Sequence, residues 1–276
     1  MIQELKRIIY NTVVEANRKM TPREVEKAVA RAAGVDRKTV TLAIKNLVSL
    51  GELTYTYLYG TSFLERSFDR PVQASKRIVI KPPDKVYQTQ PGEVVIDIAG
   101  GAAFGDGAHP TTCLALRALD SVLGDNRYAD QKAPMKGLDV GTGTGILAIA
   151  LARLGVQKVV GLDIDPCAVS EAIHNVSLNG LAEQITITNT PLEELATYFS
   201  IIVANLAYPT LKRLSSLLSE KMEMGGVVIL SGFKVSVCED LAKAYAEYGF
   251  KVIQQEMERG WACLTLCKMA LTHEGI

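Results

Sequence analysis

Apolar residues recur at helical spacing three times within the first fifty residues, which predicts three amphipathic helices. The second helix begins at Thr21 and Pro22, because Thr21 and Glu24 have the spacing of a capping box and proline is favoured at the first helical position. Asp36 can cap the third helix with its carboxylate. A glycine follows each of the last two helices, as expected where a helix ends.

The pattern then changes from helical to alternating. Leu or Tyr occupies alternate positions over residues 53–59, Gly60 offers a turn, and residues 62–68 continue as a second strand. Three helices followed by such a hairpin resemble a winged helix-turn-helix domain, which we predict for residues 1–72. In that resemblance the polar side chains of the third helix would face nucleic acid: Arg37, Lys38, Thr39 and Lys45. Such domains also dock on proteins, and a solvated helix face has the same composition.

Charge is distributed unevenly along the chain. Residues 1–70 contain 12 Lys or Arg and 8 Asp or Glu, a net charge of +4, whereas the remaining residues carry 18 and 22, a net charge of −4. The chain as a whole is neutral, so no global field draws it onto nucleic acid. Any nucleic-acid partner is therefore expected to bind through residues 1–70.

Residues 73–98 contain several prolines and two apolar runs, which predicts a linker with entry strands. Residues 99–276 are expected to form the second domain. Within it, residues 138–140 predict a strand, residues 146–154 a helix and residues 156–162 another strand. A strand, helix and strand in this order predict a parallel sheet with a right-handed crossover.

The turn between the first of these strands and the helix carries the strongest chemical signal. Three glycines alternate with threonines after an acidic residue: Asp139, Gly141, Gly143 and Gly145. This spacing departs from the G-x-G-x-x-G of nicotinamide-binding proteins, and no Gly-Lys-Ser/Thr follows, which argues against a dehydrogenase and a phosphate-binding loop. Asp163 ends the next strand, where it can accept hydrogen bonds from ribose hydroxyls, whereas Asp165 is expected to cap the following helix.

Five further strands are expected: residues 184–188, 199–204, 227–231, 250–256 and 261–268. The last two of them are expected to form an antiparallel pair. The D-x-G-x-G-x-G spacing resembles the S-adenosyl-L-methionine (SAM) turn of Rossmann-like methyltransferases. The predicted fold class is therefore α/β, with a mostly parallel methyltransferase sheet whose last strand is antiparallel. Open α/β sheets bind ligands at the carboxyl ends of their strands, and Asn205 follows one of these ends.

Six segments between residues 94 and 268 resemble, in the same order, those of PrmA, a family of ribosomal-protein methyltransferases: GAAFGDGAHPTTCLALRAL, LDVGTGTGILAIALARLG, VVGLDIDPCAV, IIVANLAYPTLKRLSSLL, GGVVILSGF and GWACLTLCK. The resemblance implies SAM as the cofactor and an amino group of a protein, from the ribosome or elsewhere in translation, as the methyl acceptor. It implies cofactor contacts at Phe104, Thr112, Asp139, Gly141, Gly143, Gly145, Asp163, Ile164 and Asn205.

Asn205 and His109 are the predicted catalytic residues. Methyl transfer to nitrogen is an in-line displacement by a neutral amine, so the protein mainly supplies alignment. The Asn205 carbonyl can accept an amine N–H and aim the lone pair, although an asparagine after a strand also suits a turn. His109 can take a proton near neutral pH, but a histidine before a proline is also an ordinary loop residue. For Thr112, the alternative to a cofactor contact is a structural position in a capped helix that starts at Pro110 and Thr111.

Two other functions stay open. A nucleic-acid methyltransferase is one, since residues 205–208, Asn-Leu-Ala-Tyr, loosely resemble the Asn-Pro-Pro-Tyr motif that grips a flipped base. A DNA-binding regulator that senses SAM is the other. The five cysteines contain no C-x-x-C pair, so we expect no metal site. The start is charged and no apolar run approaches about 18 residues, which predicts a cytoplasmic protein without a membrane partner.

Overall fold

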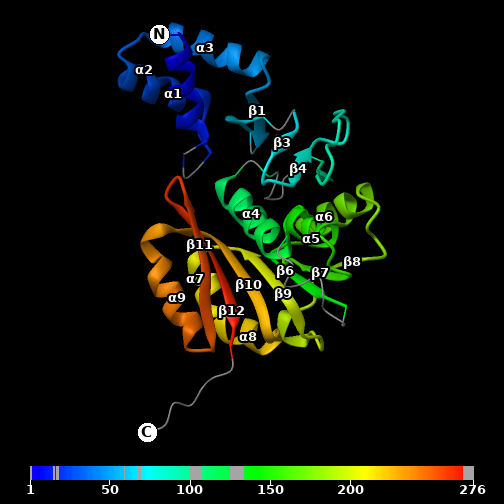
Figure 1. The fold of residues 1–276 in the computed structure, drawn as a ribbon. Helices are drawn as coiled ribbons and strands as arrows, with labels where there is room; N and C mark the ends of the chain where they lie inside the picture. The colour runs from blue at the N-terminus through cyan, green and yellow to red at the C-terminus, as the bar shows by residue number, and fades with distance from the viewer. Residues whose placement is uncertain are drawn as a thin grey trace. The chain divides into compact units, whose positions relative to one another are not determined.

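A computed structural model describes residues 2–14, 16, 19–58, 60–67, 70–99, 107, 109–124 and 134–269. The contacts divide the chain into two compact units, residues 1–71 and residues 72–276, and each is described by itself (Figure 1). The first unit contains three helices and a hairpin: α1 (Ile2–Val14), α2 (Pro22–Ala33), α3 (Arg37–Ser49), β1 (Leu53–Leu58) and β2 (Thr61–Arg66).

The predicted helix caps of the first unit are present. The Thr21 hydroxyl accepts a hydrogen bond from the Glu24 amide at 3.3 Å, and the Glu24 carboxylate accepts one from the Thr21 amide at 2.8 Å. Asp36 accepts a hydrogen bond from the Thr39 amide at 3.0 Å. Each cap satisfies a main-chain N–H that the first helical turn leaves without a partner.

The three helices and the hairpin share one apolar core. Its fully buried residues come from every element of the unit: Leu5, Ile9, Val25, Val29, Val40, Ala43, Ile44, Leu47, Leu53 and Leu64. An isolated antiparallel bridge also pairs Met20, between α1 and α2, with Leu64 of β2. The segment between the first two helices is thereby tied to the hairpin.

The second unit has an α/β architecture. Its strands are β3 (Val72–Gln73), β4 (Ile78–Lys81), β5 (Val94–Asp97), β6 (Lys136–Val140), β7 (Lys158–Leu162), β8 (Ile185–Thr188), β9 (Phe199–Asn205), β10 (Met222–Lys234), β11 (Phe250–Glu258) and β12 (Trp261–Lys268). Its α-helices are α4 (Pro110–Gly124), α5 (Ile146–Arg153), α6 (Pro166–Leu178), α7 (Tyr208–Arg213), α8 (Ser215–Lys221) and α9 (Cys238–Ala246).

Seven of these strands form one sheet in the order β11-β12-β10-β9-β6-β7-β8. The pairs β10/β9, β9/β6, β6/β7 and β7/β8 are parallel, whereas β12 runs antiparallel to both of its neighbours. Helices α4, α5 and α6 cover one face and α7, α8 and α9 cover the other (Figure 1). The predicted fold class, a mostly parallel Rossmann-like sheet with an antiparallel last strand, is confirmed.

The segment predicted as a linker with entry strands forms a small sheet of its own, in the order β3-β4-β5. Side chains of α4 hold it on the second unit. Asp120 of α4 accepts hydrogen bonds from the Ser75 hydroxyl at 2.7 Å and from the Arg77 guanidinium at 2.5 Å. Apolar side chains of β4 and β5 are buried. A sheet of such short strands is not stable alone, so it needs this packing against the rest of the unit.

Candidate active site

The turn after β6 is built from glycines with left-handed backbone conformations. The φ angle is 73° at Gly141, 56° at Gly143 and 84° at Gly145, a region in which other residues are strained. A Cβ atom on Gly141 would lie 2.4 Å from Cδ2 of Leu206. At the three glycine positions no side chain covers the main chain. A ligand at the carboxyl ends of the strands can therefore approach the main chain closely there.

Asp139 lies under this turn and is completely buried. Its Oδ2 atom accepts hydrogen bonds from the Thr142 hydroxyl at 2.7 Å and from the Ala148 amide at 3.0 Å, so it holds both the turn and the first turn of α5. Its Oδ1 atom is buried and has no hydrogen-bond partner among the described residues. Burial raises the pKa of Asp139 to about 7, against the two hydrogen bonds, and the nearby Asp163 carboxylate adds to the rise.

Asp163 stands at the end of β7, beside the glycine turn. One of its oxygens accepts a hydrogen bond from the Gly143 amide at 2.9 Å and the other from the Asp165 amide at 3.0 Å. Each carboxylate oxygen can accept a second hydrogen bond. The next side chain, Ile164, is 96% exposed, which is unusual for isoleucine. Asp165 caps α6 by accepting from the Cys167 amide at 2.9 Å, as predicted.

Asn205 and Thr112 meet at the carboxyl end of β9. The Asn205 amide nitrogen lies 3.4 Å from the Thr112 hydroxyl oxygen, and Thr112 is completely buried in the first turn of α4. The Asn205 Oδ1 atom is buried and has no hydrogen-bond partner among the described residues. A buried amide oxygen without a partner costs about 1–3 kcal/mol. An N–H group of a bound molecule that reached this atom would satisfy it.

Sequence reasoning missed the residue that places α4 on this edge. Ser231 of β10 stands beside Asn205 in the parallel register and donates its hydroxyl to the Thr111 carbonyl at 2.9 Å. Gly232 follows in a bulge, where a Cβ atom would lie 2.5 Å from the Leu206 carbonyl oxygen. The available signal was a Ser-Gly pair at the end of an otherwise apolar strand.

His109 occupies the N-cap position of α4. Its Nδ1 atom accepts a hydrogen bond from the Thr111 amide at 3.3 Å, and its carbonyl accepts one from the Thr112 amide at 3.1 Å. Its ring meets the edge of Trp261 at 5.1 Å between centroids, and the Lys234 ammonium lies 3.5 Å from the centroid of the same indole. This geometry supports a helix-capping role and uses Nδ1 for it. Phe104, another predicted site residue, lies outside the described residues.

Tyr208, which ends the Asn-Leu-Ala-Tyr segment, is half-buried at the start of α7. Its ring packs against the apolar cluster beneath α7 and α9, and its hydroxyl donates to the Asp240 carboxylate, which also pairs with Lys212 at 2.7 Å. A tyrosine that stacks on a flipped base needs a free ring face at the site. In the Asn-Leu-Ala-Tyr segment, Asn205 lies at the strand ends, whereas the tyrosine side chain is engaged by the cluster and by Asp240.

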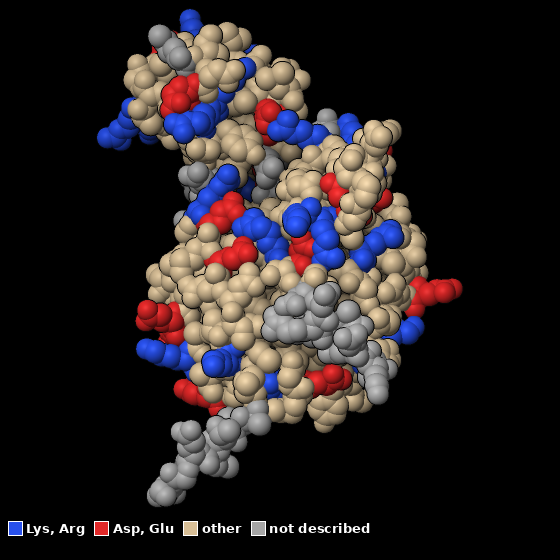
Figure 2. Space-filling model, in the orientation of Figure 1, with Lys and Arg blue, Asp and Glu red and all other residues tan. Residues whose placement is uncertain are grey.

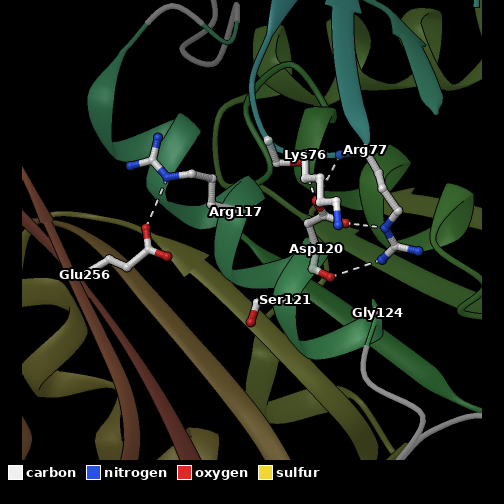
Figure 3. A pocket seen from close by; sticks show the side chains of 8 residues that line it. Lys76, Arg77, Arg117, Asp120, Ser121, Gly124 and Glu256 are labelled. Carbon is white, nitrogen blue, oxygen red and sulfur yellow. Dashed lines mark hydrogen bonds and ion pairs between the residues drawn. The ribbon is translucent and has the colours of Figure 1, made fainter. Parts of the chain in front are cut away.

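An open cavity of about 550 Å³ lies elsewhere on the second unit, between α4, the β3–β4 turn and β11 (Figure 3). Arg77 pairs with Asp120 there, and Arg117 lies 3.1 Å from Glu256 and 2.7 Å from Glu258. Basic and acidic side chains also lie side by side around this part of the surface (Figure 2). These ion pairs fasten the β3–β4 turn and β11 to α4. None of the predicted site residues that the structure describes lines this cavity.

The residues that the structure describes include no group of three His, Cys, Asp or Glu side chains that could hold a metal ion. No helix among them is both long enough and apolar enough to cross a membrane.

The seven-stranded sheet with its reversed β12, the glycine turn after β6 and the carboxylate after β7 define a Rossmann-like fold of the methyltransferase class. A family model described as "Ribosomal protein L11 methyltransferase (PrmA)" matches residues 65–269. The chain belongs to this family. Residues 1–64 lie outside the matched range.

Individual relatives agree with the family match. The chain is 35% identical over 204 residues to a ribosomal protein L11 methyltransferase of Geotalea daltonii, covering 73% of this chain and 65% of that protein. It is 40% identical over 200 residues to one of Geobacter sp. strain M21, covering 72% and 64%. The chain thus spans slightly less than two thirds of the length of these relatives. The crystal structure of a ribosomal protein L11 methylase from Lactobacillus delbrueckii subsp. bulgaricus superposes with a TM-score of 0.64 at 29% identity, covering 73% of this chain and all of that one.

Family membership indicates SAM as the cofactor, and the residues present fit it. SAM carries a positive sulfonium and an amino group, and the buried, unpartnered Asp139 Oδ1 is an acceptor suited to a cation. The glycine turn leaves room for close approach, and Asp163 retains lone pairs for hydroxyl groups. The exposed Ile164 side chain offers an apolar surface for a purine ring.

Proposed function

We propose that the protein is a SAM-dependent N-methyltransferase that acts on an amino group of a protein. The observation that carries this proposal is the buried Asn205 Oδ1 atom, which has no partner among the described residues and lies next to Thr112 at the strand ends. An amine N–H is the complementary donor. We further propose that the predicted cofactor residues, Phe104, Thr112, Asp139, Gly141, Gly143, Gly145, Asp163, Ile164 and Asn205, surround the cofactor.

When bound, SAM would supply an electrophilic methyl group: the neutral amine would form a bond to the methyl carbon in line with the C–S bond, which breaks as S-adenosylhomocysteine leaves with the electron pair. Asn205 accepts an N–H of that amine, so the nitrogen lone pair points along the line of attack. Thr112 holds the Asn205 amide in this orientation from α4. The packed first turn of α4 excludes water, because Thr111 and Thr112 are buried. The proton released on nitrogen leaves after transfer, and His109 is the predicted side chain for accepting it.

A protein acceptor is favoured over a nucleic acid by two observations. The relatives at 35–40% identity are named ribosomal protein L11 methyltransferases, so ribosomal protein L11 is the first acceptor to test. The ring of Tyr208 packs against the apolar cluster and its hydroxyl donates to Asp240, so contacts within the protein already engage this side chain, which a base-stacking role would need. We therefore propose a ribosomal or other translation-related protein as the acceptor, and the cytoplasm as the site of action.

We propose that residues 1–72 form a winged helix-turn-helix domain that recruits the acceptor, with residues 73–98 as entry strands and residues 99–276 as the methyltransferase domain. The three helices, the hairpin and the Met20–Leu64 bridge support this architecture. On α3, Leu42 is 71% exposed between the exposed Lys38 and Lys45 side chains. We propose that this face docks a protein, with Leu42 as its apolar contact, and the substitution of Leu42 tests this.

The test combines binding with labelling. Calorimetric titration with SAM and S-adenosylhomocysteine (SAH) should show one site on the wild-type protein and a large loss of affinity in Asp163→Ala. Labelled SAM should then transfer its methyl group to purified ribosomal protein L11 or to a protease-sensitive, nuclease-resistant species in extract. Label on a nuclease-sensitive species would indicate a nucleic-acid methyltransferase instead, and binding without any transfer would indicate a SAM sensor.

A further inference from the structure

Asn175 lies on the buried face of α6 with Ala168, Ala172 and Val176, and Asn179, the C-cap residue of the same helix, follows one helical turn later. Asn175 is 1% exposed and Asn179 is 6% exposed. A buried amide is unfavourable unless its donors and acceptors are satisfied. The hydrogen bonds of the two side chains therefore indicate their structural roles.

Asn175 joins two distant parts of the second unit. Its amide nitrogen donates to the Thr144 carbonyl at 2.9 Å, and Thr144 belongs to the glycine turn. Its amide oxygen accepts from the Ala99 amide at 2.9 Å, two residues after the end of β5. An asparagine amide is planar and carries its donor and acceptor on opposite sides, so it fixes the distance between the two main-chain groups that it bridges.

Asn179 makes the neighbouring contact without reaching the turn. It accepts from the Asp97 amide at 3.0 Å and donates to the Asp97 carbonyl at 2.7 Å. Its amide nitrogen also lies 2.8 Å from the Asn175 carbonyl. Asn179 thus pins β5 to α6 but leaves the glycine turn untouched, which makes it a matched control for Asn175.

The same stretch of α6 also fits closely against the turn. A Cβ atom on Gly145 would lie 3.3 Å from the Cα atom of Ala172, one turn before Asn175. The turn and the helix are therefore in direct main-chain contact on one side of Thr144. The Asn175 hydrogen bond holds the Thr144 carbonyl, so the turn cannot shift without breaking it.

We infer that Asn175 is a positioning residue for cofactor binding, because it fixes the glycine turn relative to the exit of β5. This inference rests on the proposed function, since it assigns the turn to the cofactor. Asn175 acts through the Thr144 main chain. Its loss should weaken binding of the cofactor and leave alignment of the acceptor by Asn205 unchanged.

The first experiment compares Asn175→Ala with Asn179→Ala by calorimetry with SAM and SAH, at matched folded fractions. We expect about 10-fold weaker binding in Asn175→Ala, the size typical of a residue that acts without touching the ligand, and a change within about twofold in Asn179→Ala. With ribosomal protein L11 as acceptor, KM for SAM should rise in Asn175→Ala while kcat at saturating SAM stays within about twofold.

The substitution Asn175→Asp separates the two hydrogen bonds of Asn175, to Ala99 and to Thr144. Asn179→Asp is its control, because it introduces the same charge one helical turn away. The carboxylate in Asn175→Asp keeps an acceptor for the Ala99 amide but faces the Thr144 carbonyl with a second oxygen, so this variant alone should lose SAM affinity. Equal losses in both aspartate variants, or SAM binding by Asn175→Ala as tight as wild type, would overturn the inference. A wild-type protein that binds neither SAM nor SAH would overturn the proposed function, and this inference with it.

Amide hydrogen exchange on the wild-type protein provides a measurement that does not depend on the variants folding. Saturation with SAH should slow exchange at the turn amides and at the Ala99 amide together, because Asn175 links them. Slower exchange at the turn with no change at Ala99 would contradict the linkage.

Discussion

The strand-end site of the second unit and the exposed face of α3 in the first unit both carry polar residues, but they differ in what surrounds them. At the strand ends, Asp139 and Asn205 each keep a buried oxygen that no described residue satisfies. On α3, Arg37, Lys38 and Lys45 are exposed, and water satisfies them. A buried oxygen without a partner at the strand ends calls for an explanation, and a bound ligand is one, whereas an exposed charged side chain gives no information about its partner.

Asp163→Ala tests the strand-end site most strongly. It removes the carboxylate that accepts from the Gly143 amide and that we assign to the ribose hydroxyls. Hydrogen bonds to a charged group are worth about 1.5–3 kcal/mol each, so SAM affinity measured by calorimetry should fall about 100-fold or more.

Asp165→Ala is the matched control for this variant. Asp165 caps α6 from the neighbouring exposed position, so its loss should cost about 1 kcal/mol of stability and change SAM affinity little. An equal loss of SAM affinity in the two variants would contradict the assignment of Asp163.

Asn205→Ala should affect turnover more than binding. Without the amide oxygen the acceptor amine is no longer aligned, and misplacement of reacting groups by about 1 Å can cost 100-fold in rate. We expect kcat on ribosomal protein L11 to fall by about this factor while the affinity for SAH changes little. A loss of SAH affinity with unchanged kcat would instead place Asn205 on the cofactor alone.

Asp139 should make both stability and cofactor binding depend on pH. Burial raises the pKa of Asp139 from 3.8 to about 7, so between these values the folded protein holds a proton that the unfolded chain has released. The contribution of Asp139 to the free energy of unfolding therefore decreases as pH rises through this window and levels off above it. Affinity for the cationic cofactor should increase over the same range, by up to about 10-fold per pH unit below the pKa.

Titrations of SAM at pH 6, 7 and 8 and urea unfolding from pH 4 to 8 measure these two slopes. Asp139→Asn should flatten the part of each slope that comes from this carboxylate, because the amide does not titrate. An unchanged pH dependence in that variant would show that another group titrates.

Leu42→Asp tests the exposed face of α3, where we expect the smallest effect. Leu42 makes no contribution to the core, so the variant should keep its stability within about 0.5 kcal/mol. If α3 docks a protein, KM for the acceptor should rise several-fold while SAM affinity is unchanged. The paired control Lys38→Glu should instead reduce binding to RNA or DNA in a salt-dependent way if the face binds nucleic acid.

Much of the architecture was predictable because its signals are local. The capping box at Thr21, the cap at Asp36 and the alternation of the glycine turn each act over a few residues, and the structure has all three. The carboxyl ends of parallel strands meet at one edge, so the place of Asn205 also followed from topology.

The contacts that complete the site were not predictable in this way. Ser231 reaches Thr111, and Asn175 reaches Ala99, across long stretches of chain. Such pairs depend on how α4 and α6 pack on the sheet, and periodicity within one element carries no information about that packing. The start of α4 at Pro110 was one of the predicted alternatives, but the hydrogen bond from the Thr111 amide to the His109 ring was not predicted.

The order of strands in the large sheet also has a consequence for synthesis of the chain. β6 is mostly buried and central in the sheet, but its partner on one side, β9, is completed only 65 residues after β6 ends. At translation rates of about 5–20 residues per second, one edge of β6 stays unpaired for roughly 3–13 s. During that time the nascent chain exposes hydrogen-bonding groups along this edge, and pairing with another strand competes with folding.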